Sequence, residues 1–176
     1  MLRQCSNCIL FTSLLSCLGL SMINKTVFLV YGEGGHQAQM KRLVKLLGCS
    51  DIDFVHIVDS ELSVDGNVYK TLPIRKKQSN SFLFSFFSLF YNFALAIKLF
   101  FKYKPIAVLS TGPMICFPFF IVSKLFGSKS IFLETWSRFY SKSFTAKIVY
   151  PFVDHFYYQN IELSVFYPNG KYSGRL

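Results

Sequence analysis

The 176-residue sequence predicts an α/β fold built on a parallel sheet, from two observations. Short, continuous apolar runs alternate along the chain with segments whose apolar residues recur at helical spacing. The apolar runs lack the alternating polar residues of half-exposed strands, which is typical of strands buried on both faces. Because the chain has no internal repeat and no low-complexity linker, a single domain is expected.

The first unit of this fold is a strand, a glycine loop and a helix. Residues 26–31 form a continuous apolar run, and three glycines interrupt it between positions 32 and 35. Residues 37–47 then carry Met40, Leu43 and Leu47 at helical spacing. This order of elements is the usual start of a parallel α/β sheet.

The remaining elements continue the alternation. Strands are expected at residues 54–58, 67–73, 106–109, 130–133 and 156–159. Helices are expected at residues 81–102, 114–126 and 144–149. Apolar, β-branched or aromatic residues dominate each predicted strand, whereas the helices are longer or carry helical spacing.

The helix predicted at 81–102 is rich in phenylalanine and has two unlike faces. One narrow polar stripe is formed by Ser81, Ser85, Ser88 and Asn92. A broad apolar face is formed by Phe82, Phe86, Phe90, Phe93 and Ile97. The uncharged part, 81–97, is about 25 Å long at 1.5 Å per residue, which is short for a membrane span.

Two interpretations of this helix compete, a buried core helix and a helix at a membrane surface. Basic residues flank it at both ends, in the sequence at Arg75, Lys76 and Lys77 and at Lys98, Lys102 and Lys104. Such clusters suit anionic headgroups. We therefore expect the polar stripe to dock on the sheet and Phe82, Phe86, Phe90 and Phe93 to enter one leaflet.

Composition and charge narrow the partners. The chain is 52% apolar and 18% aromatic, carries a formal net charge of +10, and is too apolar for a disordered tail. Between positions 98 and 147 it has eight Lys or Arg and a single acid, Glu134, so an anionic partner is expected. The adjacent phenylalanine-rich run favours a membrane surface over nucleic acid.

The cysteines of the sequence indicate its redox compartment. Five scattered cysteines favour a reducing compartment over a disulfide framework, and Cys5-x-x-Cys8 lacks the second ligand pair of a zinc site, so no metal is expected.

Residues 1–24 carry no charge after Arg3 and are mostly apolar from 9 to 20. They are interpreted as a membrane anchor or as an extension upstream of a start at Met22, with a cleaved signal peptide the least favoured alternative.

The glycine loop is the first candidate site. Gly32, Gly34 and Gly35 lie where the free amides of a helix N-terminus can bind phosphate. A dinucleotide fingerprint is the alternative, with Asp59 as its acid, but its third glycine is missing. The adjacent His36 is a candidate general base or phosphate ligand, and a packing or capping role is equally open.

Two further loops follow predicted strands and would lie on the same edge of the sheet. Ser110, Thr111 and Gly112 form a second possible phosphate cradle, with ordinary loop caps as the alternative. Glu134 and Arg138 follow the next strand. Their alternative role is an ion pair between residues four apart.

Taken in order, these motifs resemble a known family, the membrane-anchoring, acceptor-side subunit of split glycosyltransferases. The resemblance spans residues 27–176 and rests on Gly32–His36, Gly112–Pro118, Glu134–Arg138, 141–150, Asp154–Phe156, Gln159 and 167–176. Eukaryotic members take part in adding the second GlcNAc to dolichol-diphosphate-GlcNAc, and bacterial relatives of the PssD type serve exopolysaccharide assembly. The residues do not separate these two pathways.

The resemblance implies half of an enzyme. It corresponds to the N-terminal, Rossmann-like domain of GT-B transferases such as the peptidoglycan transferase MurG, while a separate catalytic chain binds the UDP-sugar. The implied acceptor is a polyprenyl-diphosphate-linked sugar at the cytoplasmic face of a membrane. The candidate catalytic residues are His36 and Glu134. The candidate acceptor and phosphate ligands are Gly32, Gly34, Gly35, Ser110, Thr111, Gly112 and Arg138.

The same interpretation implies no bound cofactor and no nucleic-acid partner. Two other functions remain open from the sequence. The first is a self-sufficient, NAD-binding oxidoreductase, and the second is a membrane scaffold without an acceptor role.

Overall fold

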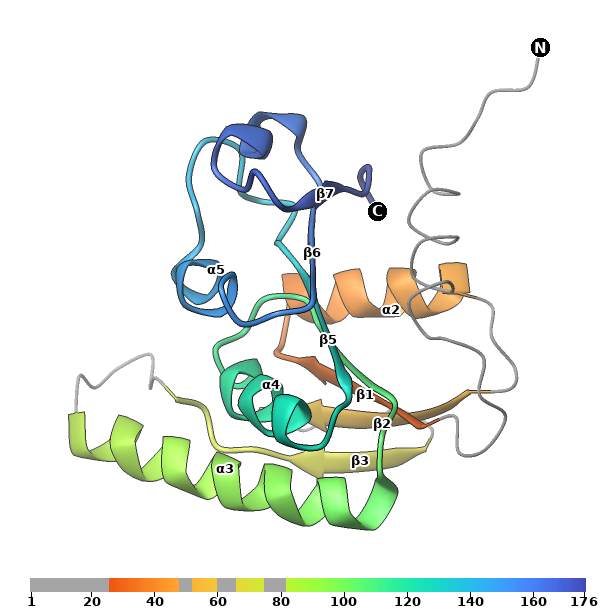
Figure 1. The fold of residues 1–176 in the computed structure, drawn as a ribbon, viewed down its shortest axis with the longest axis vertical. Coiled ribbons are helices and arrows are strands. Elements are labelled where there is room, and N and C mark those ends of the chain that lie inside the picture. Colours follow the sequence, from red (N-terminus) through yellow and green to blue (C-terminus); the bar gives the residue numbers. More distant parts are fainter. Residues whose placement is uncertain (1–25, 48–51, 60–65, 75–81) are drawn as a thin grey trace.

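The protein, as a computed structural model, is described at residues 26–47, 52–59, 66–74 and 82–176 (Figure 1). Seven parallel strands form one sheet in the order β3-β2-β1-β4-β5-β6-β7. The strands are β1 Thr26–Tyr31, β2 Asp53–Val58, β3 Asn67–Lys70, β4 Ala107–Ser110, β5 Lys129–Leu133, β6 His155–Tyr158 and β7 Lys171–Tyr172. The predicted α/β fold with a parallel sheet is therefore confirmed.

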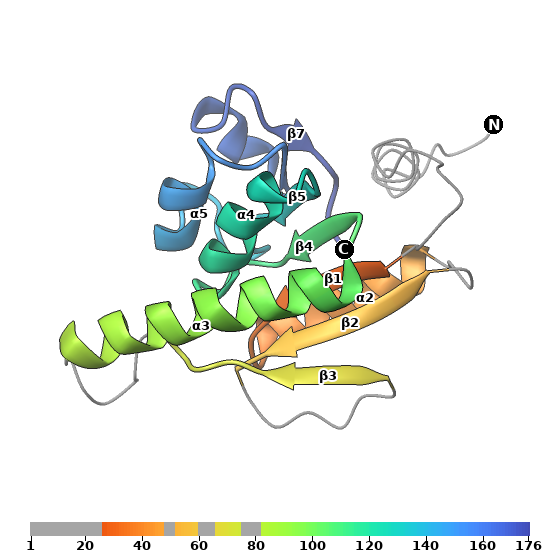
Figure 2. The same ribbon diagram turned by 60° about the horizontal axis from the view of Figure 1, so that its bottom comes forward.

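Helices cover both faces of the sheet. They are α2 Gly35–Leu47, α3 Phe82–Tyr103, α4 Cys116–Leu125, α5 Phe144–Val149 and the short 3-10 helix η1 Ile161–Val165. Figures 1 and 2 show α2 on one side of the sheet and α3, α4 and α5 on the other. The strand β7 and helix η1 were not predicted, because a two-residue exposed strand and a single 3-10 turn leave no apolar period in the sequence.

Several sequence predictions lie outside the described residues. These are the segment 1–24 with its three cysteines, the basic cluster Arg75–Lys77 and Ser81. Helix α3 begins at Phe82, but the side chain of that residue also lies outside the described part of the chain.

The inner strand β1 lies between the two layers of the core. All six of its residues are buried, because β2 and β4 pair with it on either side and helices cover both faces. Phe28 and Val30 pack with the α3, α4 and α5 layer. Leu29 and Tyr31 pack beneath α2, with Met40 of that helix. The alternation of strand side chains thus places β1 in contact with both helical layers.

Helix α3 docks through the polar stripe that the sequence predicts. Ser88 and Asn92 are fully buried. The Ser88 hydroxyl donates to the carbonyls of Leu72 and Pro73 at 3.0 Å. The side-chain Nδ2 of Asn92 donates to the Leu72 carbonyl at 2.8 Å, and its Oδ1 accepts from the backbone amide of Leu72 at 3.1 Å. These bonds satisfy backbone groups of the segment that follows β3.

The opposite side of α3 is exposed and apolar along its whole length. Its members are Leu83, Phe86, Phe87, Phe90, Tyr91, Ile97 and Phe101, each more than two-fifths exposed. Figure 2 shows the N-terminal half of the helix projecting past the carboxyl ends of β2 and β3. Among the described residues, 83–103 is the stretch long and apolar enough to cross a membrane.

One predicted member of that outer face lies elsewhere. Phe93 is partly buried and packs against the core, with its ring centroid 6.4 Å from that of Phe117. Its position one residue after the buried Asn92 turns it toward α4. We name the exposed residues Leu83, Phe86, Phe87, Phe90, Tyr91, Ile97 and Phe101 the outer face of α3, without Phe93.

Candidate functional site

The candidate site lies at the carboxyl edge of the sheet, between β1 and β4. These strands are neighbours, yet the chain leaves β1 for α2 on one face and β4 for α4 on the other. The two loops therefore diverge at this edge of the sheet, which is where open α/β sheets bind ligands.

His36 is held by the loop that follows β4. Its Nδ1 lies 2.6 Å from the Thr111 carbonyl oxygen, and the Thr111 hydroxyl donates to the His36 carbonyl at 3.0 Å. A carbonyl oxygen only accepts hydrogen bonds, so Nδ1 of the neutral ring carries the proton and donates it. This tautomer leaves the lone pair on Nε2, the nitrogen that a general base needs.

Glycine at position 112 makes room for the imidazole. Gly112 has φ +125°, and a Cβ built on it would lie 2.6 Å from Cε1 of His36. Any side chain there would displace the ring or the loop. The ring of His36 is thus packed against the backbone of Gly112, and both loops contribute to its position.

Asp59, at the end of β2, lies beside the glycine loop. A Cβ on Gly32 would lie 3.3 Å from both of its carboxylate oxygens, and Oδ1 is buried without a hydrogen-bond partner among the described residues. Burial raises the pKa of Asp59, and the charge of Glu33 acts in the same direction, while nearby amides and His36 oppose the shift. From the sequence alone, Asp59 has a role only in the dinucleotide-binding alternative.

Ser110 is the last residue of β4, and Thr111 begins the loop that follows it. Both are fully buried, and the Gly112 amide donates to the Ser110 hydroxyl at 3.4 Å. Beneath this loop, burial raises the pKa of the Cys116 thiol to about 12, so the thiol stays protonated. Exposed groups at this edge are Gly34, with φ +68°, and Gly35, at the start of α2.

Glu134 is fully buried, and donors of its own chain occupy both carboxylate oxygens. Oε1 accepts from the Thr135 amide at 3.0 Å. Oε2 accepts from the Tyr167 hydroxyl at 2.7 Å, the Ser143 hydroxyl at 3.1 Å and the Ser143 amide at 3.4 Å. The Arg138 guanidinium is exposed and donates to Ser141 at 3.4 Å, so the contacts differ from the ion pair considered above.

Trp136 joins the site without having been predicted. Its Nε1 would lie 3.9 Å from a Cβ added to Gly35. The Arg42 guanidinium lies 4.8 Å from the centroid of the Trp136 ring. Its position is thus beside the glycine loop. The available signal was that the single tryptophan of the chain falls inside the Glu134–Arg138 motif.

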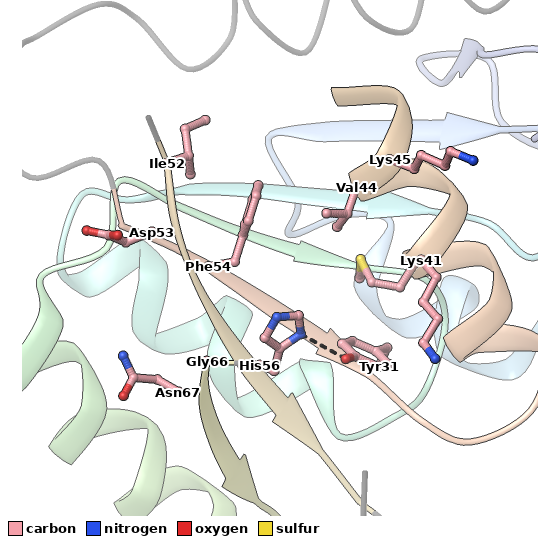
Figure 3. A pocket seen from close by; sticks show the side chains of 11 residues that line it. Tyr31, Lys41, Val44, Lys45, Ile52, Asp53, Phe54, His56, Gly66 and Asn67 are labelled. Atoms are coloured by element: carbon pink, nitrogen blue, oxygen red, sulfur yellow. Dashed lines mark hydrogen bonds between the residues drawn. The ribbon is translucent and has the colours of Figure 1, made fainter. Parts of the chain in front are cut away.

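A separate hollow of about 580 Å³ lies between α2 and the first halves of β2 and β3. Figure 3 shows Tyr31 and His56 at its floor, joined by a hydrogen bond of 2.8 Å from the Tyr31 oxygen to Nδ1. Burial raises the pKa of Tyr31 and lowers that of His56. None of the loop residues described above lines this hollow, so it is distinct from the candidate site.

Comparison with known proteins gives one family. The family described as "Oligosaccharide biosynthesis protein Alg14 like" matches residues 27–176. The UDP-N-acetylglucosamine transferase subunit ALG14 of Yarrowia lipolytica is 28% identical over 176 residues, covering 87% of this chain and 82% of the relative. The subunit of the same name from Rattus norvegicus is 27% identical, covering 85% and 82%.

Solved structures share the fold. MurG from Acinetobacter baumannii superposes with a TM-score of 0.58 at 15% identity over 77% of this chain. UDP-GlcNAc 2-epimerase from Methanocaldococcus jannaschii gives 0.59 at 12% identity over 80%. The chain spans 41% of the length of each of these proteins. At this identity the likeness concerns the fold, which is that of one domain of a larger chain.

Proposed function

Because the chain belongs to the Alg14-like family of oligosaccharide biosynthesis proteins, we propose that it is the acceptor-side subunit of a two-chain UDP-sugar glycosyltransferase. It binds a polyprenyl-diphosphate-linked sugar at the cytoplasmic face of a membrane and recruits a catalytic chain that binds the UDP-sugar. The relatives' names make UDP-GlcNAc the first donor to test. The similarity to about two-fifths of MurG agrees with a fold completed by a second chain.

The observation that carries the proposal is the state of His36. Its Nδ1 proton is committed to Thr111, so the lone pair of Nε2 is the one left to accept a proton at this edge of the sheet. In the proposed reaction Nε2 takes the proton of the acceptor hydroxyl while that oxygen forms a bond to C1 of the donor sugar. The bond from C1 to the UDP oxygen breaks, and UDP leaves with its electron pair.

The acceptor diphosphate is assigned to the start of α2. The amides of Gly34 and Gly35 are exposed there, and a helix N-terminus favours negative charge. The exposed guanidinium of Arg138 supplies a cation at the same edge of the sheet. Asp59 lies against Gly32, at the other end of the loop from Gly35, and its carboxylate would repel a diphosphate bound there.

Membrane association is assigned to the outer face of α3. This surface is apolar from Leu83 to Phe101, and Phe126, the residue after α4, continues it, with its ring centroid 5.1 Å from that of Phe101. Exposed lysines stand around its C-terminal end, at positions 98, 102, 104, 124 and 129. Since the inner side of α3 packs on the core, the helix lies along the surface of one leaflet.

The experiment is UDP release with and without the partner. The tagged chain is purified alone and together with its co-purifying catalytic chain, then given UDP-GlcNAc and a polyprenyl-diphosphate-linked GlcNAc. We expect no turnover by the chain alone and turnover by the complex. In the complex, His36→Ala lowers kcat by roughly 10²-fold or more if Nε2 is the base.

His155→Ala is the matched control, since His155 lies at the start of β6, on the amino edge of the sheet. Turnover by the isolated chain would refute the two-chain enzyme. Full activity of the His36→Ala complex would favour the scaffold without an acceptor role.

A further inference from the structure

We infer that Glu134 is a positioning residue, whose buried carboxylate fixes the loop of residues 135–143 and thereby holds Trp136 against the glycine loop as one wall of the acceptor site. The inference rests on the proposed function for the meaning of that wall. Its first support is burial. Glu134 has no exposed surface, so its carboxylate cannot reach an acceptor hydroxyl without opening the fold.

The second support is the set of donors around the carboxylate. Oε2 receives hydrogen bonds from Ser143 at one end of the loop and from Tyr167 of the C-terminal segment, and Oε1 receives one from Thr135 at the other end. One side chain therefore closes the loop on itself and ties it to a third segment. Charge-assisted hydrogen bonds of this kind are stronger than neutral ones.

The third support is that the middle of the loop is held as well. The Asn160 amide donates to the carbonyls of Trp136, at 2.9 Å, and Arg138. Lys142 places its Nζ 5.3 Å from the centroid of the Tyr167 ring. Trp136 is thereby presented to Gly35, with Arg42 of α2 over its ring.

The backbone of Glu134 extends the same network to the end of the chain. Its carbonyl accepts from the Gln159 amide at 3.0 Å, and the Gln159 carbonyl oxygen accepts from the Leu176 amide at 3.0 Å. Arg42 joins the same hydrogen-bond network by donating to the Leu176 carbonyl at 3.2 Å. The residue that contacts Trp136 from α2 is thus linked back to Glu134.

Two substitutions separate positioning from catalysis. Glu134→Gln replaces an oxygen that accepts by an amide nitrogen that donates, which faces donors already in place. Tyr167→Phe removes one donor and leaves the carboxylate intact, so a catalytic Glu134 would survive it. Tyr172→Phe is the matched control, because Tyr172 is an exposed residue of β7 and lies outside the network.

The first readout is the fluorescence of Trp136, the single tryptophan of the chain, and it needs neither the partner nor turnover. In the isolated full chain, we expect Glu134→Gln and Tyr167→Phe to increase quenching of this fluorescence by acrylamide, while Tyr172→Phe leaves it unchanged. Circular dichroism identifies variants that keep the fold. Unchanged quenching in folded Glu134→Gln and Tyr167→Phe chains overturns the inference, even if the complex later proves to be the proposed transferase.

The second readout is kinetic, in the complex with the catalytic chain. We expect both variants to raise KM for the lipid-linked acceptor about tenfold and to change kcat much less. A loss of kcat of roughly 10²-fold in Glu134→Gln alone, with Tyr167→Phe normal, makes Glu134 the base and overturns the inference. If Glu134→Gln does not fold, Tyr167→Phe decides both readouts.

Discussion

At the scale of single residues, the position of His36 depends on a glycine in another loop. A methyl group at position 112 would meet Cε1 of His36 at 2.6 Å, and the φ of +125° is itself unfavourable for an L side chain. In the reconstituted complex, Gly112→Ala is expected to lower kcat by roughly 10²-fold, since a displaced catalytic group costs about that much.

The control for this change is Gly127→Ala. Gly127 also has a left-handed φ, +70°, but a Cβ there meets nothing within 4 Å. The expected loss is then confined to stability, about 1 kcal/mol. Equal kcat values for the two variants would show that Gly112 does not position His36.

Asp59 gives a pH-dependent prediction at the same scale. Burial raises the pKa of its carboxyl, so between the ordinary pKa of aspartate and the raised value the native state holds a proton that the unfolded chain has released. Stability therefore falls as the pH rises through this window. Asp59→Asn, which carries no charge, is expected to be more stable than the natural chain at neutral pH.

Urea midpoints measured between acidic and neutral pH check this expectation. The difference between Asp59→Asn and the natural chain should shrink as the pH falls toward the ordinary pKa of aspartate. Asp53→Asn, at an exposed position, serves as the control. A variant that is less stable at neutral pH would mean that the carboxylate stabilises the glycine loop more than its burial costs.

The site could be predicted from sequence only in part. The strand, glycine loop and helix fix where Gly34, Gly35 and His36 lie, because they are neighbours in the chain. The contact of His36 with Thr111 joins residues 75 positions apart and depends on the strand order. The burial of Glu134 was equally hidden, because its partner Tyr167 lies in a segment without an apolar period.

At the scale of elements, α3 allows a direct test of membrane binding. Phe86 and Phe90 are 65% and 70% exposed, so replacing both by serine removes apolar surface without opening the core. We expect Phe86→Ser/Phe90→Ser to lose binding to vesicles that contain anionic lipid, with an unchanged circular dichroism spectrum. Sedimentation with vesicles measures the bound fraction.

The matched control replaces two equally exposed apolar residues elsewhere. Ile161 and Val165 lie on η1, which Figure 1 shows far from α3. Ile161→Ser/Val165→Ser should bind vesicles like the natural chain. If both double variants bind equally, the outer face of α3 is not the membrane contact.

The polar stripe of α3 could be predicted because it depends only on the helical spacing of its polar residues. Ser88 and Asn92 have this spacing, and both bind the backbone of the segment after β3. The prediction that Phe93 belongs to the exposed face was wrong, because the helical spacing of residues does not determine how wide the buried side of a helix is. The neighbouring helix α4 decides that width, through the contact of Phe93 with Phe117. Pro118 is tolerated in α4 because it falls in the first turn, where its missing amide has no partner to lose.

At the scale of the whole molecule, charge and apolar surface are expected to act together. The net charge is +10, and exposed lysines stand near the C-terminal end of α3. Raising the salt from about 0.1 M to about 1 M shortens the Debye length from roughly 10 Å to roughly 3 Å. Vesicle binding should weaken accordingly but persist in part, because the apolar contact is not screened.

The comparison vesicles contain only neutral lipid. Binding to them should be weaker at low salt and nearly independent of salt. Binding that is the same for both lipid compositions would assign the whole interaction to the apolar surface.

The strand order also has a consequence for biosynthesis. Strand β1 must pair with β4, yet the whole of α3 is synthesised, and emerges from the ribosome, before β4 and α4. Until then the inner residues Ala96, Leu99 and Phe100 lack the part of their cover that α4 supplies, and the nascent helix is apolar on both sides. Such a chain favours early adsorption to a bilayer or capture by a chaperone while it is being made.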